Sequence, residues 1–463
     1  MRAGIGAASA NRVLPMVIFA LLSGATLALF SGWNKPLLYD EFVYFAAAGL
    51  PSTAAALETV WNTTTNVNQG VTGAFLMTDF WLLQLFGAQT EALRLPGLLT
   101  AGLLFGYSAV FLLRRGLSYW VLPAIPLAFG TQELVLRYVG EARTYMPLAT
   151  ATVGVLAYYS LSASGRHSLG GRLLGWSAVV LGVLFHPYFA VYWIAIVGFG
   201  YVTWGRSRPL REFINLPLVA FGTVTYLVIG ALTWMRGKAN ADVDPFNFLP
   251  GPLPVEIVAQ NLYFVAASPI ALLGLIVVLI VPLAVQVAEG WSISQFWQAS
   301  KAPLLLIAVA LVLSLAISAS TIINDFWIFP RQWIASTALV CLASIWLVAE
   351  WWKLSSAEST NGPAPQWRST AVIVASIGLV VMTVPSLVDQ WQRIASWGDR
   401  PTPGFDARQQ LRERLDSGDV LNDAEWTSFG QMNLDVGGEV WKEFGRFYTD
   451  TDWSTFFLTD RVA

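Results

Sequence analysis

The chain has 463 residues, of which 55% are hydrophobic and only 12% are charged, and its formal net charge at pH 7 is −2. Ordinary soluble domains carry about twice that charged fraction, so the composition excludes a typical soluble protein. The sequence contains no Walker-type nucleotide loop and no Gly-x-Gly-x-x-Gly phosphate cradle. A single cysteine, Cys341, excludes an intrachain disulfide, and two histidines argue against a histidine-based metal site. We expect an integral membrane protein that contacts membrane lipids and has no nucleic-acid partner.

Charge-free apolar runs recur along the chain, and most are long enough for one helix to cross a bilayer of about 30 Å. The run 13–34 resembles a secretory signal, but it is longer than the apolar core of such a signal. We therefore predict a retained helix. The run 173–204 is long enough for two crossings, with a break at His186-Pro187. We predict an all-α polytopic membrane protein with about eleven transmembrane helices. The charge-free runs include residues 13–34, 95–113, 173–204, 213–235, 262–288, 302–324 and 369–388, and a further span is predicted directly after Arg331.

Basic residues are distributed unequally between the two sides of this topology. With the N-terminus in the cytoplasm, twelve Lys and Arg residues fall inside and seven fall outside before residue 389. This is the direction that the positive-inside rule requires. The apolar stretch 70–87 must then lie in the membrane interface, because a further crossing would place Arg114 and Arg115 outside and invert every later loop.

Two regions are predicted to be external. Residues 31–93 form a loop with juxtamembrane helices within a transmembrane domain that spans residues 1–388. Residues 389–463 are polar, with fourteen acidic and eight basic residues and five tryptophans. We expect this C-terminal region to form a tail or a small cap domain on the membrane surface.

An acidic pair, Asp40-Glu41, follows the first predicted helix on the external side. The pair could cap the next helix, since carboxylates favour the positive end of a helix dipole. Alternatively, a carboxylate at the boundary of water and lipid could accept a proton from a hydroxyl group during group transfer.

Other candidate residues lie at predicted helix ends on the same side. Arg143, close to Glu141, could pair with that carboxylate or extend to the interface, or it could serve a substrate. Arg331 suits either a lipid headgroup or a bound phosphate, which a guanidinium grips with two hydrogen bonds. His186 could be a structural histidine or a substrate contact.

Several short motifs occur in order over about the first 200 residues, and together they resemble one known family. This is the GT-C superfamily of membrane glycosyltransferases, in the bacterial branch related to protein O-mannosyltransferases and the lipid A aminoarabinose transferase. One departure concerns the His-Pro-Pro motif of many relatives, because residues 68–72 here read Asn-Gln-Gly-Val-Thr. The matching motifs are Tyr39-Asp40-Glu41, Trp81-Leu-Leu-Gln-Leu-Phe-Gly87, Glu91-Ala-Leu-Arg94-Leu-Pro96, Arg114-Arg115, Arg137-Tyr138, Glu141-Ala-Arg143-Thr-Tyr145 and His186-Pro-Tyr-Phe, followed later by Pro330-Arg331.

The resemblance implies an inverting transferase that takes a sugar from a polyprenyl-phosphate donor. It works on the periplasmic or external face of the bacterial inner membrane, on an acceptor that is a lipopolysaccharide, another envelope glycan, a lipid or a protein. The resemblance makes Asp40 the catalytic base, and the adjacent Glu41 could orient the acceptor or pair with a cation. Arg143, Arg331 and Tyr145 would then hold the donor phosphate, while Glu141, His186 and Arg94 would contact substrate. No cofactor is assigned, and a divalent cation at Asp40, Glu41 and Glu141 stays open.

Two other functions fit a polytopic chain. A transporter or a flippase of lipid-linked sugars would also carry intramembrane charges, but such proteins often show repeated halves and polar groups near the bilayer midplane. Here the charges gather toward one face and the halves do not resemble each other. An inactive relative that acts as an assembly partner is the third alternative.

Overall fold

The computed structural model describes an all-helical arrangement, and the part of the chain that it covers contains no strand. The described residues are 7–33, 52–62, 73–87, 90–117, 119, 121–130, 132–162, 169–206, 209–239, 293–323, 330–357, 388 and 392. The apolar runs 262–288 and 369–387 lie outside them, as do residues from 389 onward apart from position 392.

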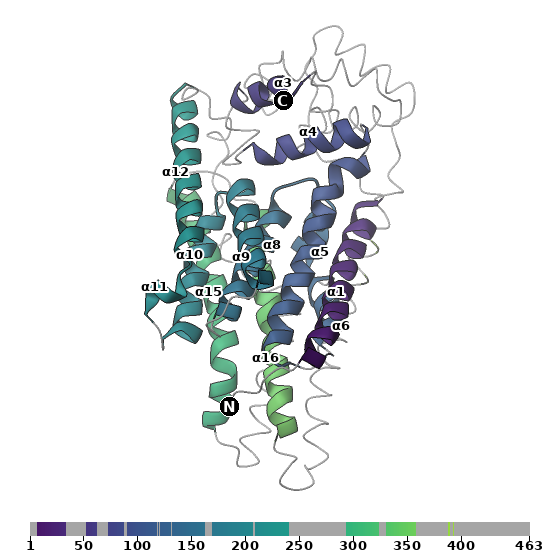
Figure 1. Ribbon diagram of the computed structural model, residues 1–463, viewed down its shortest axis with the longest axis vertical. Coiled ribbons are helices and arrows are strands. Elements are labelled where there is room, and N and C mark those ends of the chain that lie inside the picture. Colours follow the sequence, from purple (N-terminus) through teal and green to yellow (C-terminus); the bar gives the residue numbers. More distant parts are fainter. Residues whose placement is uncertain are drawn as a thin grey trace.

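Four helices are long and apolar enough to cross a membrane, and each coincides with a predicted span. They are α1 (Ala7–Trp33), α5 (Thr90–Arg114), α15 (Ile293–Ile323) and α16 (Ile334–Ala357). In Figure 1 these helices run roughly parallel to the long axis of the molecule. The membrane character and the helical class are therefore confirmed, while the total of about eleven crossings stays a prediction.

Further helices complete the bundle. The predicted break at His186 is confirmed, because α9 ends at Phe185 and α10 begins at Phe189. A π-helix, η2 (Tyr201–Gly205), continues α10. The remaining helices of the bundle are α6 (Val121–Gly130), α7 (Glu133–Val139), α8 (Tyr145–Ser162), α9 (Leu169–Phe185), α10 (Phe189–Gly200), α11 (Leu210–Phe213) and α12 (Leu216–Ala239).

Two helices of the predicted external loop, α3 (Thr53–Asn62) and α4 (Ala74–Phe86), lie across one end of the bundle (Figure 1). With 13 residues, α4 is too short to cross a bilayer. Its buried side chains Phe75, Asp79 and Leu83 recur every four residues and so share one face. The ring of Phe75 contacts that of Phe185 at the end of α9, with centroids 5.8 Å apart. The helix thus rests on the bundle, as the juxtamembrane prediction for residues 70–87 requires.

Contacts between helix ends define the end of the bundle that lies under α4, which we call the α4 end. Ser31 at the end of α1 donates a hydrogen bond of 2.6 Å to the carbonyl oxygen of Leu136 in α7. A hydrogen bond of 2.8 Å joins Tyr192 in the first turn of α10 to Ser336 in the first turn of α16. The α4 end therefore contains the ends of α1, α7 and α9 and the beginnings of α5, α8, α10 and α16.

Helices α1 and α5 approach each other closely because both carry glycine at the interface. A Cβ atom on Gly24 would collide with the carbonyl group of Ala101, and one on Gly102 would lie 3.1 Å from the carbonyl oxygen of Leu21. Small residues let helix backbones meet in lipid, where van der Waals packing rather than hydrophobic burial holds helices together.

The opposite end of the bundle holds an aromatic cage around Arg115. Its guanidinium carbon lies 5.0 Å from the ring centre of Phe111, 4.5 Å from Trp204 and 4.0 Å from Trp346. Burial lowers the pKa of Arg115 to about 10 against the opposing effect of Glu350, so the side chain remains a cation at neutral pH. The cage joins the end of α5 to η2 and α16.

Replacing Arg115 with Ala should lower the apparent melting temperature of the purified protein. The change removes three cation–π contacts, which together contribute on the order of 2 kcal/mol in a desolvated site, and it leaves space between the rings. The neighbouring Arg114 is exposed, so Arg114→Ala is the matched control and should melt like the wild type. Equal melting temperatures for the two variants, measured in the same detergent, would show that the cage does not stabilise the fold.

Candidate functional site

Four charged side chains are buried at or near the α4 end. Their exposed fractions are 0% for Asp79, 9% for Arg94, 0% for Glu141 and 8% for Arg143. Charged groups are seldom buried so completely unless opposite charges or hydrogen bonds compensate them. The set consists of two carboxylates and two guanidinium groups, so it is neutral in total.

The turn between α7 and α8 carries two of these charges. The backbone N–H of Arg143 donates to the carbonyl oxygen of Glu141 at 2.9 Å, and that of Glu141 donates to Tyr138 at 3.2 Å. The turn lies directly against α5, where a Cβ atom on Gly97 would be 3.0 Å from the carbonyl oxygen of Glu141. Arg94 stands one helical turn before Gly97, so α5 brings it to the same region.

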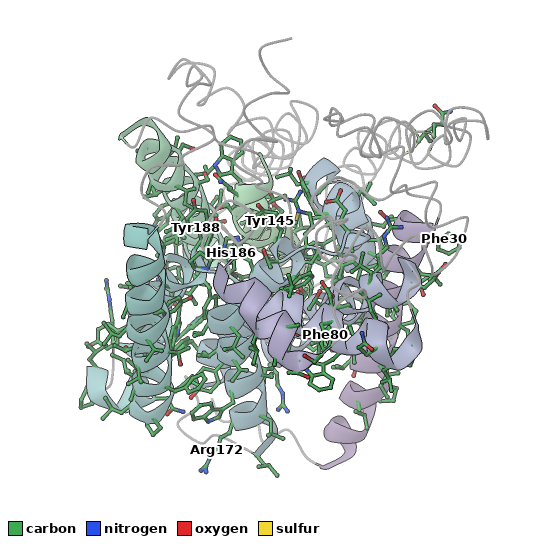
Figure 2. All side chains as sticks on the ribbon, turned by 90° about the horizontal axis from the view of Figure 1, so that it is seen from above. Phe30, Phe80, Tyr145, Arg172, His186 and Tyr188 are labelled. Atoms are coloured by element: carbon green, nitrogen blue, oxygen red, sulfur yellow. The ribbon has the colours of Figure 1, made fainter. Side chains whose placement is uncertain are left out.

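A row of rings connects this turn to the start of α10. The guanidinium carbon of Arg143 lies 5.2 Å from the ring centre of Tyr145, which in turn lies 5.6 Å from Tyr138 and 5.5 Å from His186. The imidazole of His186 lies 5.2 Å from the ring of Tyr188. Figure 2, which looks onto the α4 end, shows Tyr145, His186 and Tyr188 side by side. Three predicted site residues, Arg143, Tyr145 and His186, are thus neighbours.

His186 is held in one orientation within the turn between α9 and α10. Its Nδ1 atom accepts a hydrogen bond of 3.2 Å from the backbone N–H of Tyr188, and its carbonyl oxygen accepts one of 3.3 Å from Tyr226. Burial lowers the pKa of His186 to about 3, so the ring is neutral at physiological pH. Because Nδ1 is an acceptor, the ring proton of the neutral form is on Nε2. His186 can therefore donate a hydrogen bond but does not supply a positive charge.

The backbone of Arg331 lies in η3 (Pro330–Trp333), a short 3₁₀ segment directly before α16. Trp333 is fully buried and donates from Nε1 to Ser318 Oγ of α15 at 3.2 Å. This bond fixes η3 at the junction of α15 and α16. The side chain of Arg331 is outside the described residues, so its contact with a phosphate stays a prediction.

Asp40 and Glu41 both lie outside the described residues, and their catalytic role also stays a prediction. Within the described ranges no group of three or more potential metal ligands occurs. Asp79 lies within the apolar stretch 70–87 and was not among the predicted site residues. Its spacing of four residues from Phe75 and Leu83 on a short apolar helix was the available signal.

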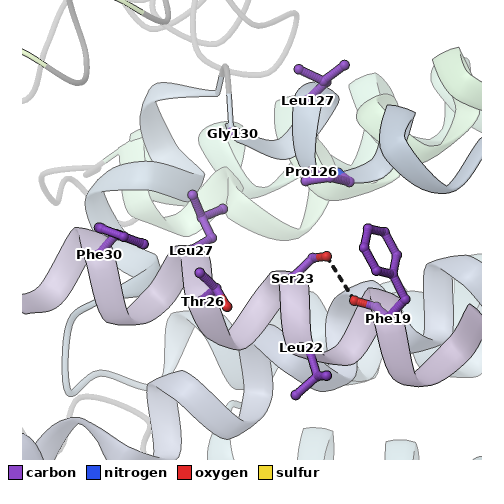
Figure 3. Close-up of a pocket in the computed structure, with 9 residues that line it drawn as sticks. All are labelled: Phe19, Leu22, Ser23, Thr26, Leu27, Phe30, Pro126, Leu127 and Gly130. Atoms are coloured by element: carbon purple, nitrogen blue, oxygen red, sulfur yellow. Dashed lines mark hydrogen bonds between the residues drawn. The ribbon is translucent and has the colours of Figure 1, made fainter.

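An apolar groove of about 480 Å³ lies between α1 and α6 (Figure 3). Its lining contains no ionisable side chain, and the hydroxyl of Ser23 bonds to the carbonyl oxygen of Phe19 at 2.8 Å. The groove therefore offers no group for acid–base chemistry. Its lining residues are Phe19, Leu22, Ser23, Thr26, Leu27, Phe30, Pro126, Leu127 and Gly130.

Comparisons with known proteins leave the family open. No protein-family model matches the sequence, and no curated protein matches it. Among solved structures, the chain is similar to ArnT from Cupriavidus metallidurans in the crystal structure bound to undecaprenyl phosphate. The identity is 18% and the TM-score 0.42, over 95% of this chain and 78% of that chain. Since a TM-score below 0.5 is no basis for assigning a shared fold, the function must be argued from the residues of this chain.

Proposed function

We propose that the chain is an inverting glycosyltransferase of the bacterial inner membrane, which moves a sugar from polyprenyl phosphate to an acceptor hydroxyl on the external face. The observation that carries the proposal is the buried Arg143 on the ring of Tyr145, next to the neutral donor His186. A desolvated cation flanked by hydrogen-bond donors suits a phosphate group that gains negative charge as its bond to the sugar breaks. The ordered motifs of the first 200 or so residues support the same assignment.

In the proposed reaction, Asp40 accepts the proton of an acceptor hydroxyl while the hydroxyl oxygen attacks the anomeric carbon of the sugar. The bond between that carbon and the phosphate oxygen breaks on the opposite face, and polyprenyl phosphate leaves with the electron pair. The configuration at the anomeric carbon is therefore inverted. Phosphate is a fair leaving group, so the protein needs to supply positioning, charge neutralisation by Arg143 and Arg331, and one base.

The placement of charge favours this function over a flippase or a transporter. In such proteins the substrate site lies near the bilayer midplane, between broken helices. Here the turns between helices carry Glu141, Arg143 and His186, and Arg94 lies in the first turn or two of α5. A reaction at an interface, where a water-soluble acceptor meets a lipid-linked donor, needs its charges at such helix ends.

Mass spectrometry of envelope glycans from cells with and without the protein tests the proposal. We expect one sugar residue to be missing from a defined glycan, lipid or protein in its absence, which would also identify acceptor and sugar. Purified protein should restore that residue when it is mixed with the polyprenyl-phosphate donor. An unchanged glycan profile, or restoration that requires an intact membrane barrier, would instead favour an assembly role or a flippase.

A further inference from the structure

Gln332 holds a buried acceptor atom that the proposed chemistry has not used. The residue lies in η3 and is 8% exposed. Its side-chain oxygen Oε1 is buried and accepts no hydrogen bond from any residue that the structure describes. An amide oxygen removed from water without a donor carries its full desolvation penalty, and most buried polar groups in folded proteins avoid that penalty.

The surrounding structure holds Gln332 in this position. Trp333 is fully buried and bonded to Ser318 of α15, and its carbonyl oxygen accepts a hydrogen bond of 3.3 Å from Thr337. Both anchors are on the residue directly after Gln332. The backbone at Gln332 therefore cannot turn toward solvent without releasing a buried tryptophan.

Gln332 belongs to the α4 end, near the row of rings around His186. It precedes Ser336 by four residues, which is about one helical turn, and Ser336 is bonded to Tyr192 at 2.8 Å. Tyr188 likewise precedes Tyr192 by four residues, and its ring lies 5.2 Å from that of His186. Gln332 and Tyr188 therefore each lie about one turn from the Tyr192–Ser336 hydrogen bond, both toward the α4 end.

We propose that Gln332 binds the transferred sugar, with its Oε1 atom accepting a hydrogen bond from a sugar hydroxyl group. The inference rests on the proposed function and specifies which part of the donor this residue recognises. A sugar offers several hydroxyl donors, whereas an ionised phosphate offers only acceptors and would be repelled by a carbonyl oxygen. The adjacent Arg331 has the opposite chemistry and suits the phosphate. In this proposal, Gln332 binds the sugar and Arg331, the preceding residue of η3, binds the phosphate.

The substitution Gln332→Met tests the proposal because methionine keeps the length of the side chain and removes the polar atoms. Without substrate, the variant should melt at the same temperature as wild type or higher, since it loses an unpaired buried acceptor. Asn215→Leu is the control, because Asn215 donates to Tyr158 at 2.9 Å and accepts from the backbone N–H of Leu218 at 3.3 Å. That variant should melt lower. A similar drop for Gln332→Met would assign Gln332 a structural bond and overturn the proposal.

The second measurement uses donor kinetics with undecaprenyl phosphate carrying mannose, glucose or aminoarabinose. For the sugar that wild type transfers, Gln332→Met should raise KM about tenfold, the effect of one lost hydrogen bond to a sugar. Inhibition by undecaprenyl phosphate without sugar should be unchanged. An unaltered KM, or an equal loss of affinity for both lipids, would overturn the assignment. Wild type that neither transfers a sugar nor binds undecaprenyl phosphate would refute the proposed function itself, and this inference with it.

Discussion

Asp40→Asn is expected to lower the rate of sugar transfer by about 100- to 10,000-fold, the usual effect of losing a positioned general base. Asparagine keeps the size and most of the hydrogen-bonding shape of aspartate, but it cannot accept the proton of the acceptor hydroxyl. The variant should therefore purify like wild type and bind the polyprenyl-phosphate sugar with similar affinity. Single-turnover transfer with bound donor, measured beside a donor titration, separates the chemical step from binding.

The other two candidate carboxylates, Glu41 and Glu141, provide the controls for Asp40. Glu41→Gln should be less severe, because Glu41 is assigned only to orienting the acceptor. Glu141→Gln should also be less severe than Asp40→Asn, because Glu141 is assigned to substrate contact and not to proton transfer. Near-normal turnover by Asp40→Asn together with an inactive Glu41→Gln or Glu141→Gln would reassign the base. Activity in all three variants would remove the catalytic centre from the transferase proposal.

The sequence predicted those parts of the fold that depend on local composition. Runs of about 20 apolar residues identified α1, α5, α15 and α16, because in lipid a helix satisfies its own backbone hydrogen bonds. The His186-Pro187 break was equally visible, since a proline disfavours helical geometry in the residue before it. The aromatic cage could not be predicted, because it joins Phe111, Trp204 and Trp346 from three distant segments.

The candidate site was predictable to the extent that charge marks it. Arg94, Glu141, Arg143 and His186 stood out because ionisable groups at the ends of apolar helices are rare, and the structure brings them to one end of the bundle. Gln332 gave no such signal, since an uncharged amide between Arg331 and Trp333 is unremarkable in sequence. Its interest arises only from burial and from the hydrogen bonds that its oxygen lacks among the described residues.

Arg143→Ala should reduce kcat/KM for the donor by about 100- to 1,000-fold, comparable to the loss of one preorganised group that stabilises transition-state charge. Both parameters should change. KM rises because the guanidinium group attracts the ground-state phosphate, and kcat falls because the attraction increases as the leaving group gains charge. Arg143→Lys keeps the charge but loses the planar guanidinium group, which can form bidentate hydrogen bonds and contacts the ring of Tyr145. It should therefore recover only part of the activity.

A loss of stability could imitate this kinetic effect, because Arg143 is 8% exposed and contacts the ring of Tyr145. The melting temperature of each variant must therefore be measured beside its kinetics, with the exposed Arg172→Ala as the control for removing an arginine elsewhere. If Arg143 binds the donor, undecaprenyl phosphate should raise the melting temperature of wild type and Arg172→Ala but not that of Arg143→Ala. An equal rise in all three, with unchanged KM and kcat, would make Arg143 a structural arginine and leave the donor phosphate to Arg331 or to another group.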